Sequence, residues 1–522
     1  MFDLISVLIK DKTFIHSVEN KTAEINFYSE VSFEEFDALL SRIKVNGEII
    51  ESRKIDFHTF AAVKYNGFVY YINFYENINE LYVVKDFTSS YLTFSSPIDD
   101  YSFTPEITQI NLEEFGLSYV VRLSNGKFIV FDAGFDFPPD HEKLYNRLKK
   151  GSQGQPICVA AWVLTHAHSD HLFGFVGFMS TYGDCVKIEK LLFNFPNHDD
   201  YEHYPELLKS GYNTTNHNAG EYIQMLYEII DKYNIDVCTP HTGQVYNIAD
   251  AVCEIIASID DTIHCSTDLN STSTVIRMEL QGQVILWTAD ASLGKAKLDE
   301  KHGNHLKSDI LQIPHHGYDS GKESVVMRCY DLIKPRVCLM PVASFYAYTV
   351  HVAGRESVRY LYTKLGVEEV IAGDPERTIQ LPYTPPLSAK QELRNNVVSG
   401  YNKCGASTWV FMNLNTSNPL DFKFTLLNLT NTKLTVDAEL FFETKKQRIR
   451  FVRAEVDGFC VKQICLTDDS VQTEDVVYYN PSSMQKRGIP ENTPFAIRFM
   501  SDKPFVVSNE IHNPTYYTQA QI

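Results

Sequence analysis

Four metal-binding side chains lie within six residues, directly after an apolar run. Residues 159–164 (Val-Ala-Ala-Trp-Val-Leu) indicate a buried strand, and His166, His168, Asp170 and His171 follow it in the pattern H-x-H-x-D-H. Histidine and aspartate are ligands of catalytic zinc, manganese and iron sites. The pattern differs from H-E-x-x-H, whose two histidines share one face of a helix. The sequence therefore predicts a metal site where a strand ends at the edge of a sheet.

The spacing within this cluster favours two metal positions. On a tight loop, His166 and His168 can point at one ion, while Asp170 and His171 turn toward a second. Two ions about 3.5–4 Å apart clamp a displacement at carbon or phosphorus and lower the pKa of a water between them toward about 7. Such a site also needs a bridging carboxylate and ligands from other segments of the chain.

Suitable ligands follow other apolar strands. Three further strands end in aspartate or histidine: residues 128–131 before Asp132, residues 284–288 before Asp290, and residues 310–313 before His315 and His316. Helical patterns at residues 222–230 and 357–365 alternate with these strands. The mixture predicts sheets with helices packed outside them. A site at one rim of two packed sheets would bring all these side chains together.

With these motifs, residues 106–385 resemble the metallo-β-lactamase-fold superfamily. The resemblance implies an α/β (α+β) domain of the αβ/βα sandwich type and a hydrolase that uses one or two divalent ions. Zinc is preferred, with manganese or iron as alternatives. It also implies a role for each matching residue: His166, His168, Asp170, His171, Asp290 and His315 as metal ligands, with Asp290 as the bridge, and Asp132 as support of the loop behind the metals.

The motifs constrain the roles in catalysis less than they constrain the metal ligands. Asp170 is expected to orient the attacking hydroxide, and His316, His315 or His351 to protonate the leaving group. Of the adjacent His315 and His316, one is expected to bind metal and the other to support it or donate a proton, and either assignment stays open.

One position departs from the common pattern of the superfamily. Asn270 stands where many members carry a third histidine for the first metal. The first site is then a ligand short, or it recruits His241 or His264. His198 and His203 are further candidates.

Several segments resemble one narrower branch of this superfamily. Residues 309–317 (Asp-Ile-Leu-Gln-Ile-Pro-His-His-Gly), with residues 239–244 and 270–273, resemble the nuclease-like domain of bacterial DNA-uptake channels and the phosphorylcholine esterases. That branch implies phosphodiester hydrolysis. The alternatives are hydrolysis at a carbonyl carbon, as in lactonases, thioesterases or lactamases, and a non-catalytic, metal-stabilised ligand-sensing or scaffold protein.

The flanking segments are expected to be β-rich. Residues 1–105 alternate apolar and polar positions around turns such as Asn66-Gly67, with one helix from Ser32 whose capping box includes Glu35 and whose apolar face includes Phe33. Residues 386–400 are predicted to be a linker, and residues 401–522 a β-sandwich. The last segment resembles the sensory-rhodopsin transducer family, which implies a homo-oligomer formed through this domain.

Charge and cysteine usage limit the partners. A net charge of −19 disfavours long nucleic acid, so a small or capped phosphodiester is the expected substrate, although a local basic groove stays open. The 10 cysteines include no C-x-x-C pair, which is typical of a reducing compartment. No apolar run reaches about 18 residues. We therefore expect a soluble cytoplasmic protein with no membrane partner.

Overall fold

The computed structural model describes most of the chain. The described residues are 14–19, 22–88, 95–96, 102–113, 116–195, 219–262, 264–265, 268–318, 320–342, 355–373, 375–386, 389, 406–415, 422–442, 447–465, 477–478 and 494–511. The chain divides into two compact units, which are described separately. Unit 1 comprises residues 1–341 and 373–383, and unit 2 comprises residues 342–372 and 384–522.

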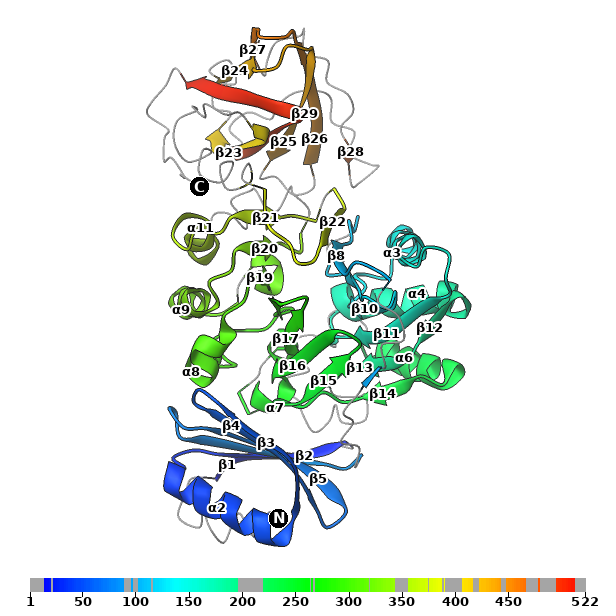
Figure 1. Cartoon of the computed structure of the whole chain (residues 1–522), viewed down its shortest axis with the longest axis vertical. Coiled ribbons are helices and arrows are strands. Elements are labelled where there is room, and N and C mark those ends of the chain that lie inside the picture. The colour runs from blue at the N-terminus through cyan, green and yellow to red at the C-terminus, as the bar shows by residue number, and fades with distance from the viewer. Residues whose placement is uncertain are drawn as a thin grey trace. The chain divides into compact units, whose positions relative to one another are not determined.

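Unit 1 begins with a six-stranded antiparallel sheet of order β1-β2-β6-β5-β4-β3 (Figure 1). Its strands are β1 (Phe14–Glu19), β2 (Ala23–Tyr28), β3 (Glu48–Ile55), β4 (His58–Tyr65), β5 (Phe68–Tyr75) and β6 (Glu80–Asp86). The predicted hairpin is confirmed, because Asn66 and Gly67 join β4 to β5 with φ angles of 49° and 82°. Two positive φ angles are what a two-residue turn between twisted strands requires.

The predicted helix is α2 (Phe33–Asn46), and its capping box is confirmed. The Ser32 hydroxyl accepts from the Glu35 N–H at 3.3 Å, and the Glu35 carboxylate accepts from the Ser32 N–H at 2.8 Å. The prediction that Phe33 lies on the apolar face is wrong, since its side chain is 41% exposed. Leu39 is buried instead, because Phe33 is the first residue of the helix and lies beside the ammonium of Lys54.

The first sheet of the central region has the order β14-β13-β11-β10-β9-β8-β22, and β12 also pairs with β11. Its strands are β8 (Glu106–Gln109), β9 (Tyr119–Arg122), β10 (Phe128–Phe131), β11 (Ile157–Val163), β12 (Val186–Ile188), β13 (Lys190–Leu192), β14 (Asp236–Cys238) and β22 (Arg377–Gln380). Strands β10, β11, β13 and β14 are parallel, so their carboxyl ends share one edge. The helices that accompany this sheet are α3 (Pro138–Gly151), α4 (Gly174–Tyr182) and α6 (Ala219–Tyr233).

The second sheet of unit 1 has the order β20-β19-β18-β17-β16-β15-β7. Its strands are β7 (Ser95–Ser96), β15 (Val245–Ile248), β16 (Ala251–Ala257), β17 (Val275–Leu280), β18 (Gln283–Trp287), β19 (Ile310–Gln312) and β20 (Val337–Leu339). Strands β18, β19 and β20 are parallel. The helices around it are α7 (Ile259–Thr262), α8 (Leu298–His302) and α9 (Glu323–Ile333), with short turns η4 (Asn270–Thr272), η5 (Gly303–Leu306) and η6 (Pro314–Gly317).

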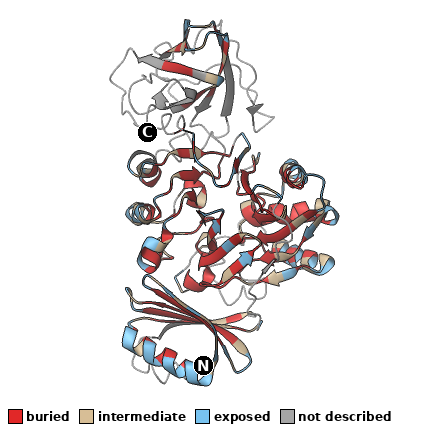
Figure 2. Cartoon of the chain, in the orientation of Figure 1, coloured by how far each residue is buried: buried red, intermediate tan, exposed pale blue. Residues whose placement is uncertain are grey.

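The two central sheets pack face to face. Trp287 of β18 stacks on Phe131 of β10 with ring centroids 4.3 Å apart, and Tyr119 of β9 meets the same indole at 5.1 Å. Helices cover the outer sides of both sheets (Figure 1). This arrangement confirms the predicted fold class, an αβ/βα sandwich beside a β-rich N-terminal region. Figure 2 shows that the sheets are mostly buried, whereas α2 exposes its outer face.

Unit 2 contains α11 (Glu356–Thr363), β21 (Glu369–Ile371) and a β-rich C-terminal part, as the pattern predicts. The described strands of that part form one sheet of order β27-β24-β29-β25-β26-β28, in which β23 also pairs with β29. Its strands are β23 (Ala406–Asn415), β24 (Phe422–Asn428), β25 (Leu434–Phe442), β26 (Gln447–Val456), β27 (Val461–Cys465), β28 (Val477–Tyr478) and β29 (Pro494–Ile511). The predicted linker, 386–400, lies almost wholly outside the described residues. Among the residues that the structure describes, no helix has both the length and the apolar character needed to cross a membrane.

Candidate metal centre

The predicted site residues follow the carboxyl ends of strands from both central sheets. Strand β11 leads into Thr165 and then into a π-helical turn, η1 (Ser169–Phe173), which carries Asp170 and His171. Asp132 follows the neighbouring β10, Asp290 follows β18, and His316 follows β19. Parallel neighbours end at the same edge, so these segments meet at one rim of the sandwich.

Left-handed backbone turns the chain at three of these strand ends. Asp132, Ala289, His315 and His316 have φ angles of 48°, 47°, 48° and 55°. A non-glycine residue in this region costs about 1–2 kcal/mol, and such residues concentrate at functional sites, where packing holds them. The backbone at this rim is therefore held in a conformation that its residue types do not favour.

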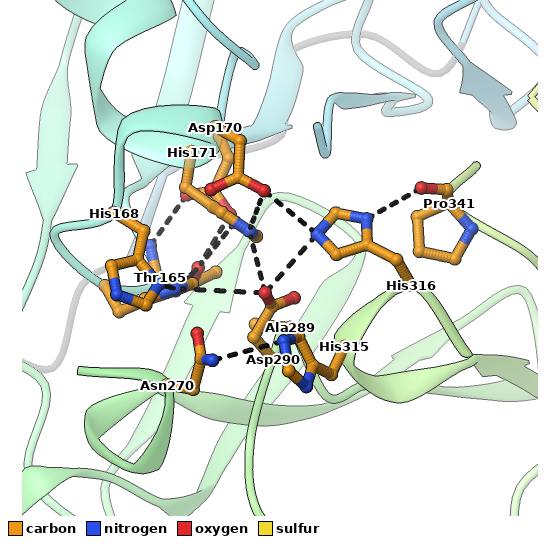
Figure 3. A network of polar contacts seen from close by, with 12 residues as sticks. Thr165, His168, Asp170, His171, Asn270, Ala289, Asp290, His315, His316 and Pro341 are labelled. Atoms are coloured by element: carbon orange, nitrogen blue, oxygen red, sulfur yellow. Dashed lines mark hydrogen bonds and ion pairs between the residues drawn. The ribbon is translucent and has the colours of Figure 1, made fainter. Parts of the chain in front are cut away.

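Asp170, His171, Asp290 and His316 form a compact cluster, named the rim cluster below (Figure 3). One ligand atom from each residue lies within 4.8 Å of the others. Nε2 of His171 is 3.2 Å from Oδ2 of Asp290, and Nε2 of His316 is 3.2 Å from Oδ2 of Asp170. Nε2 of His316 is also 3.3 Å from Oδ2 of Asp290, so the Asp290 carboxylate lies between both imidazoles.

Each imidazole of the rim cluster is oriented through its other nitrogen. Oδ2 of Asp132 lies 2.7 Å from Nδ1 of His171, and both Asp132 oxygens also accept hydrogen bonds from Thr165. Nδ1 of His316 lies 2.8 Å from the carbonyl oxygen of Pro341. A carboxylate or carbonyl on one ring nitrogen fixes the tautomer and leaves the other nitrogen to bind a metal.

Two further histidines lie beside the rim cluster. Nε2 of His166 is 3.0 Å from Nδ1 of His168 and 4.0 Å from Oδ2 of Asp290. Asn270, in η4, places Nδ2 3.2 Å from Nε2 of His315, while its Oδ1 is buried and makes no hydrogen bond. His166 and His168 therefore lie next to each other beside the rim cluster, and His315 lies next to Asn270 and not in the rim cluster.

The carboxylates and imidazoles of the rim cluster shift one another's pKa values. Burial alone lowers the pKa of His316, but Asp290 and Asp170 outweigh it and raise the pKa to about 9. The pKa of His171 is also raised well above its usual value against the effect of burial, by Asp290, Asp170 and Asp132. Burial raises the pKa of Asp290, but the two imidazoles outweigh it and hold this pKa well below its usual range. The carboxylates thus favour the charged form of both imidazoles, and the imidazoles favour the charged form of Asp290.

His166 and His168 differ in charge from the two histidines of the rim cluster. Burial lowers the pKa of His166 well below its usual value, and His171 and His168 lower it further. Burial also lowers the pKa of His168, although Asp170 and Asp290 oppose the shift. Both rings are therefore neutral at pH 7, which is the form in which histidine binds metals.

The rim cluster fits a divalent cation. Its donor set is two carboxylates and two imidazoles, which suits zinc, manganese or iron. Oδ1 of Asp290 is buried and makes no hydrogen bond. Buried polar atoms without a hydrogen bond are uncommon in folded proteins, and a bound ion is one reason for them. Within the described parts of the chain, this is the one group with metal-site geometry.

Other predicted residues lie elsewhere. Nδ1 of His241 is 2.9 Å from Asp260, and its ring stacks on Tyr71 of the N-terminal sheet at 4.7 Å. His264 stacks on Phe27 of that sheet at 4.3 Å. Neither histidine belongs to the rim cluster. The predicted candidates His198, His203 and His351 lie outside the described residues.

Sequence reasoning missed three residues that hold the site. Thr165 donates hydrogen bonds to both oxygens of Asp132, and the Pro341 carbonyl oxygen orients His316. The side-chain oxygen of Gln312 accepts from the N–H groups of Thr288 and Ala289. Thr165 lies beside the metal motif and could have been noticed there. The contacts of Pro341 and Gln312 depend on tertiary structure and left no local signal.

Part of the chain is similar to a known protein family and to several solved structures. Residues 112–248 match the family model described as the metallo-beta-lactamase superfamily. The metallo-beta-lactamase fold protein YhfI from Bacillus subtilis is 12% identical over 53% of this chain and 100% of that chain, with a TM-score of 0.32. CmlA, a diiron beta-hydroxylase from Streptomyces venezuelae, is 12% identical over 55% of each chain, with a TM-score of 0.32. The Anabaena sensory rhodopsin transducer is 19% identical over 21% of this chain and 84% of that chain, with a TM-score of 0.16. No curated protein matches the chain.

Proposed function

We propose that this protein is a metal-dependent hydrolase that acts on a phosphodiester, because residues 112–248 match the model of the metallo-beta-lactamase superfamily. The observation that carries the proposal is the rim cluster, in which Asp170, His171, Asp290 and His316 converge within 4.8 Å. Such a set supplies the carboxylates and imidazoles that a hydrolytic metal site uses.

The contacts support an assignment of the metal ligands. Asp170, His171 and His316 would hold one ion, and Asp290 would bridge to a second ion held by His166 and His168, with Asn270 as a weak oxygen ligand. His316 replaces His315 as the proposed ligand, because Nε2 of His316 lies 3.2 Å from Asp170 and 3.3 Å from Asp290. When bound, the ions supply Lewis acidity and lower the pKa of a coordinated water to about 7.

Several residues of the chain would prepare the site for this chemistry. Asp132 and Pro341 aim the two imidazoles of the rim cluster inward. Asp170, which is 14% exposed in its side chain, is the cluster's most accessible carboxylate and is suited to orient a water molecule. His315 lies beside the cluster and is our candidate to contact the substrate.

The phosphodiester assignment rests on the segment that carries His316. Residues 309–317, with residues 239–244 and 270–273, resemble the branch whose chemistry is phosphodiester hydrolysis. The net charge of −19 favours a small or capped substrate over long nucleic acid. Zinc is the preferred ion, and manganese and iron suit the same donors.

The test is a hydrolysis assay on the full chain loaded with zinc or manganese. We expect cleavage of bis(p-nitrophenyl) phosphate, and loss of at least about 100-fold in kcat/KM in Asp170→Ala and Asp290→Ala. Asp299→Ala is the matched control, because Asp299 is similarly buried but pairs with Arg328 away from the cluster. Unchanged activity in Asp170→Ala and Asp290→Ala would overturn the site.

The same assay separates the substrate classes. Cleavage of a lactone or thioester without cleavage of phosphodiesters would assign the protein to hydrolysis at a carbonyl carbon. Tight metal binding with no hydrolysis of either class would leave a non-catalytic sensing or scaffold role.

A further inference from the structure

We propose that Gln312 is a positioning residue that couples the carboxylate of Asp290 to the imidazole of His316. Gln312 is the last residue of β19, and its side chain reaches the strand end of the neighbouring β18. The inference concerns the geometry of the rim cluster and rests on the proposed function only for its consequence in catalysis.

Both polar atoms of the Gln312 amide make two hydrogen bonds to the backbone. Its Oε1 accepts from the N–H groups of Thr288 at 2.9 Å and Ala289 at 2.6 Å. Its Nε2 donates to the carbonyl oxygens of Ala289 at 3.2 Å and Ile313 at 2.6 Å. Gln312 is 1% exposed, so no water competes for these bonds. One side chain therefore joins the backbone of two strand ends.

These bonds act on the residues that matter for the metal. Ala289 takes part in two of these bonds, since its N–H donates to Gln312 and its carbonyl oxygen accepts from Gln312. Ala289 adopts the left-handed conformation with φ of 47° and directly precedes Asp290. The Ala289 carbonyl also accepts from the N–H of His315 at 2.9 Å, one residue before His316. The ladder between β18 and β19 ends at the pair Leu286 and Leu311, so the amide continues the connection beyond the last paired residues.

The expected consequence is a loss of metal affinity. Without the amide, Ala289 has no side-chain bond that holds its left-handed backbone, and the Asp290 carboxylate can move independently of His316. Loss of a group that orients metal ligands typically weakens metal binding or activity by about 10–100-fold. A residue that supports only the core would leave the metal affinity of the folded protein unchanged.

The variant Gln312→Met tests the idea, because methionine has nearly the same length and no polar head. Gln244→Met is the matched control. Gln244 is 3% exposed and similarly bonded, but its amide contacts Tyr71, Tyr246 and the His241 N–H outside the rim cluster. The readouts are the Co²⁺ dissociation constant by competition with a chelator, the visible absorption of bound Co²⁺, and the thermal unfolding of the metal-free chain.

We expect Gln312→Met to weaken Co²⁺ binding by about 10–100-fold and to change the Co²⁺ spectrum, while Gln244→Met does neither. Equal affinity and an unchanged spectrum in Gln312→Met would overturn the inference. If Gln312→Met does not fold, Gln312→Glu, which keeps an acceptor for the two N–H groups, must show the same weakening or the inference fails. If the wild-type chain binds Co²⁺ but hydrolyses no ester, the proposed function fails while the positioning role stands.

Discussion

Replacing Lys301 with methionine probes the contact between the N-terminal sheet and the metal-bearing region. The Lys301 ammonium lies 2.7 Å from Oδ1 of Asp261, and the two side chains are 1% and 2% exposed. The same ammonium lies 4.7 Å and 4.2 Å from the ring centroids of Tyr75 and Tyr82, which belong to the N-terminal sheet. Asp261 is in α7, where the neighbouring Thr262 bonds the carbonyl of Ser271 next to Asn270.

The magnitude follows from the uncompensated carboxylate. Removing one partner of a buried ion pair costs about 3–5 kcal/mol, because the remaining charge stays buried. The carboxylate keeps hydrogen bonds from the hydroxyls of Thr242 and Tyr75 and from the Ser258 N–H, so the lower end applies. We expect Lys301→Met to lower the free energy of unfolding of unit 1 by about 3 kcal/mol.

Tryptophan fluorescence during urea unfolding measures this loss. Of the three tryptophans, Trp162 and Trp287 lie buried in unit 1, and Trp409 lies in β23 of unit 2. A Trp409→Phe background therefore reports on unit 1 alone. The exposed pair of Lys54 and Glu76 gives the control, because Lys54→Met should cost at most about 1 kcal/mol.

Adding Asp261→Asn to Lys301→Met provides the decisive comparison. The amide removes the buried charge, so the double variant should be more stable than Lys301→Met alone. A cost below about 1 kcal/mol for Lys301→Met, or additive losses in the double variant, would refute the reasoning.

Three further outcomes follow from the contacts. Asp132→Asn should weaken Co²⁺ binding by about 10–100-fold, because the carboxylate that fixes His171 is lost. Chelator competition measures the Co²⁺ dissociation constant, and an unchanged value would count against the role of Asp132 in orienting His171. Burial lowers the pKa of His58 from 6.5 to about 4, so the unfolded chain binds a proton below pH 6.5 that the folded chain does not. His58 alone should therefore contribute a loss of about 3 kcal/mol of stability between pH 6.5 and 4, and His58→Gln should reduce the pH dependence by this amount in urea titrations at several pH values. Arg498→Met should destabilise unit 2, since Arg498 pairs with buried Glu439 across β25 and β29. Trp409 fluorescence should report the earlier unfolding of unit 2, while the Co²⁺ affinity stays constant.

The local signals in the sequence identified elements well. The Asn66-Gly67 turn, the capping box of Ser32 and Glu35, and the helix at residues 222–230 all depend on residues close together in the chain. The structure has each of them. The metal motif after β11 also needs no tertiary information, because its ligands are almost contiguous.

Contacts between residues far apart in the chain could not be predicted from the sequence. His315 and His316 are adjacent and chemically identical, and the left-handed backbone at both residues decides which ring turns toward Asp290. The partner of His241 is Asp260, and Tyr71 from another sheet covers it. Such pairings arise from packing between segments, and composition or spacing cannot reveal them.

Strand β29 makes the C-terminal sheet a slow structure to assemble. It pairs with β23, β24 and β25, and its residue Phe505 pairs with Ala406, about one hundred residues earlier in the chain. The N-terminal sheet joins β4 to β5 through only two residues. Folding slows as contacts become less local, because a long loop must close before the contact forms. The two sheets should therefore reach their native pairing on different time scales.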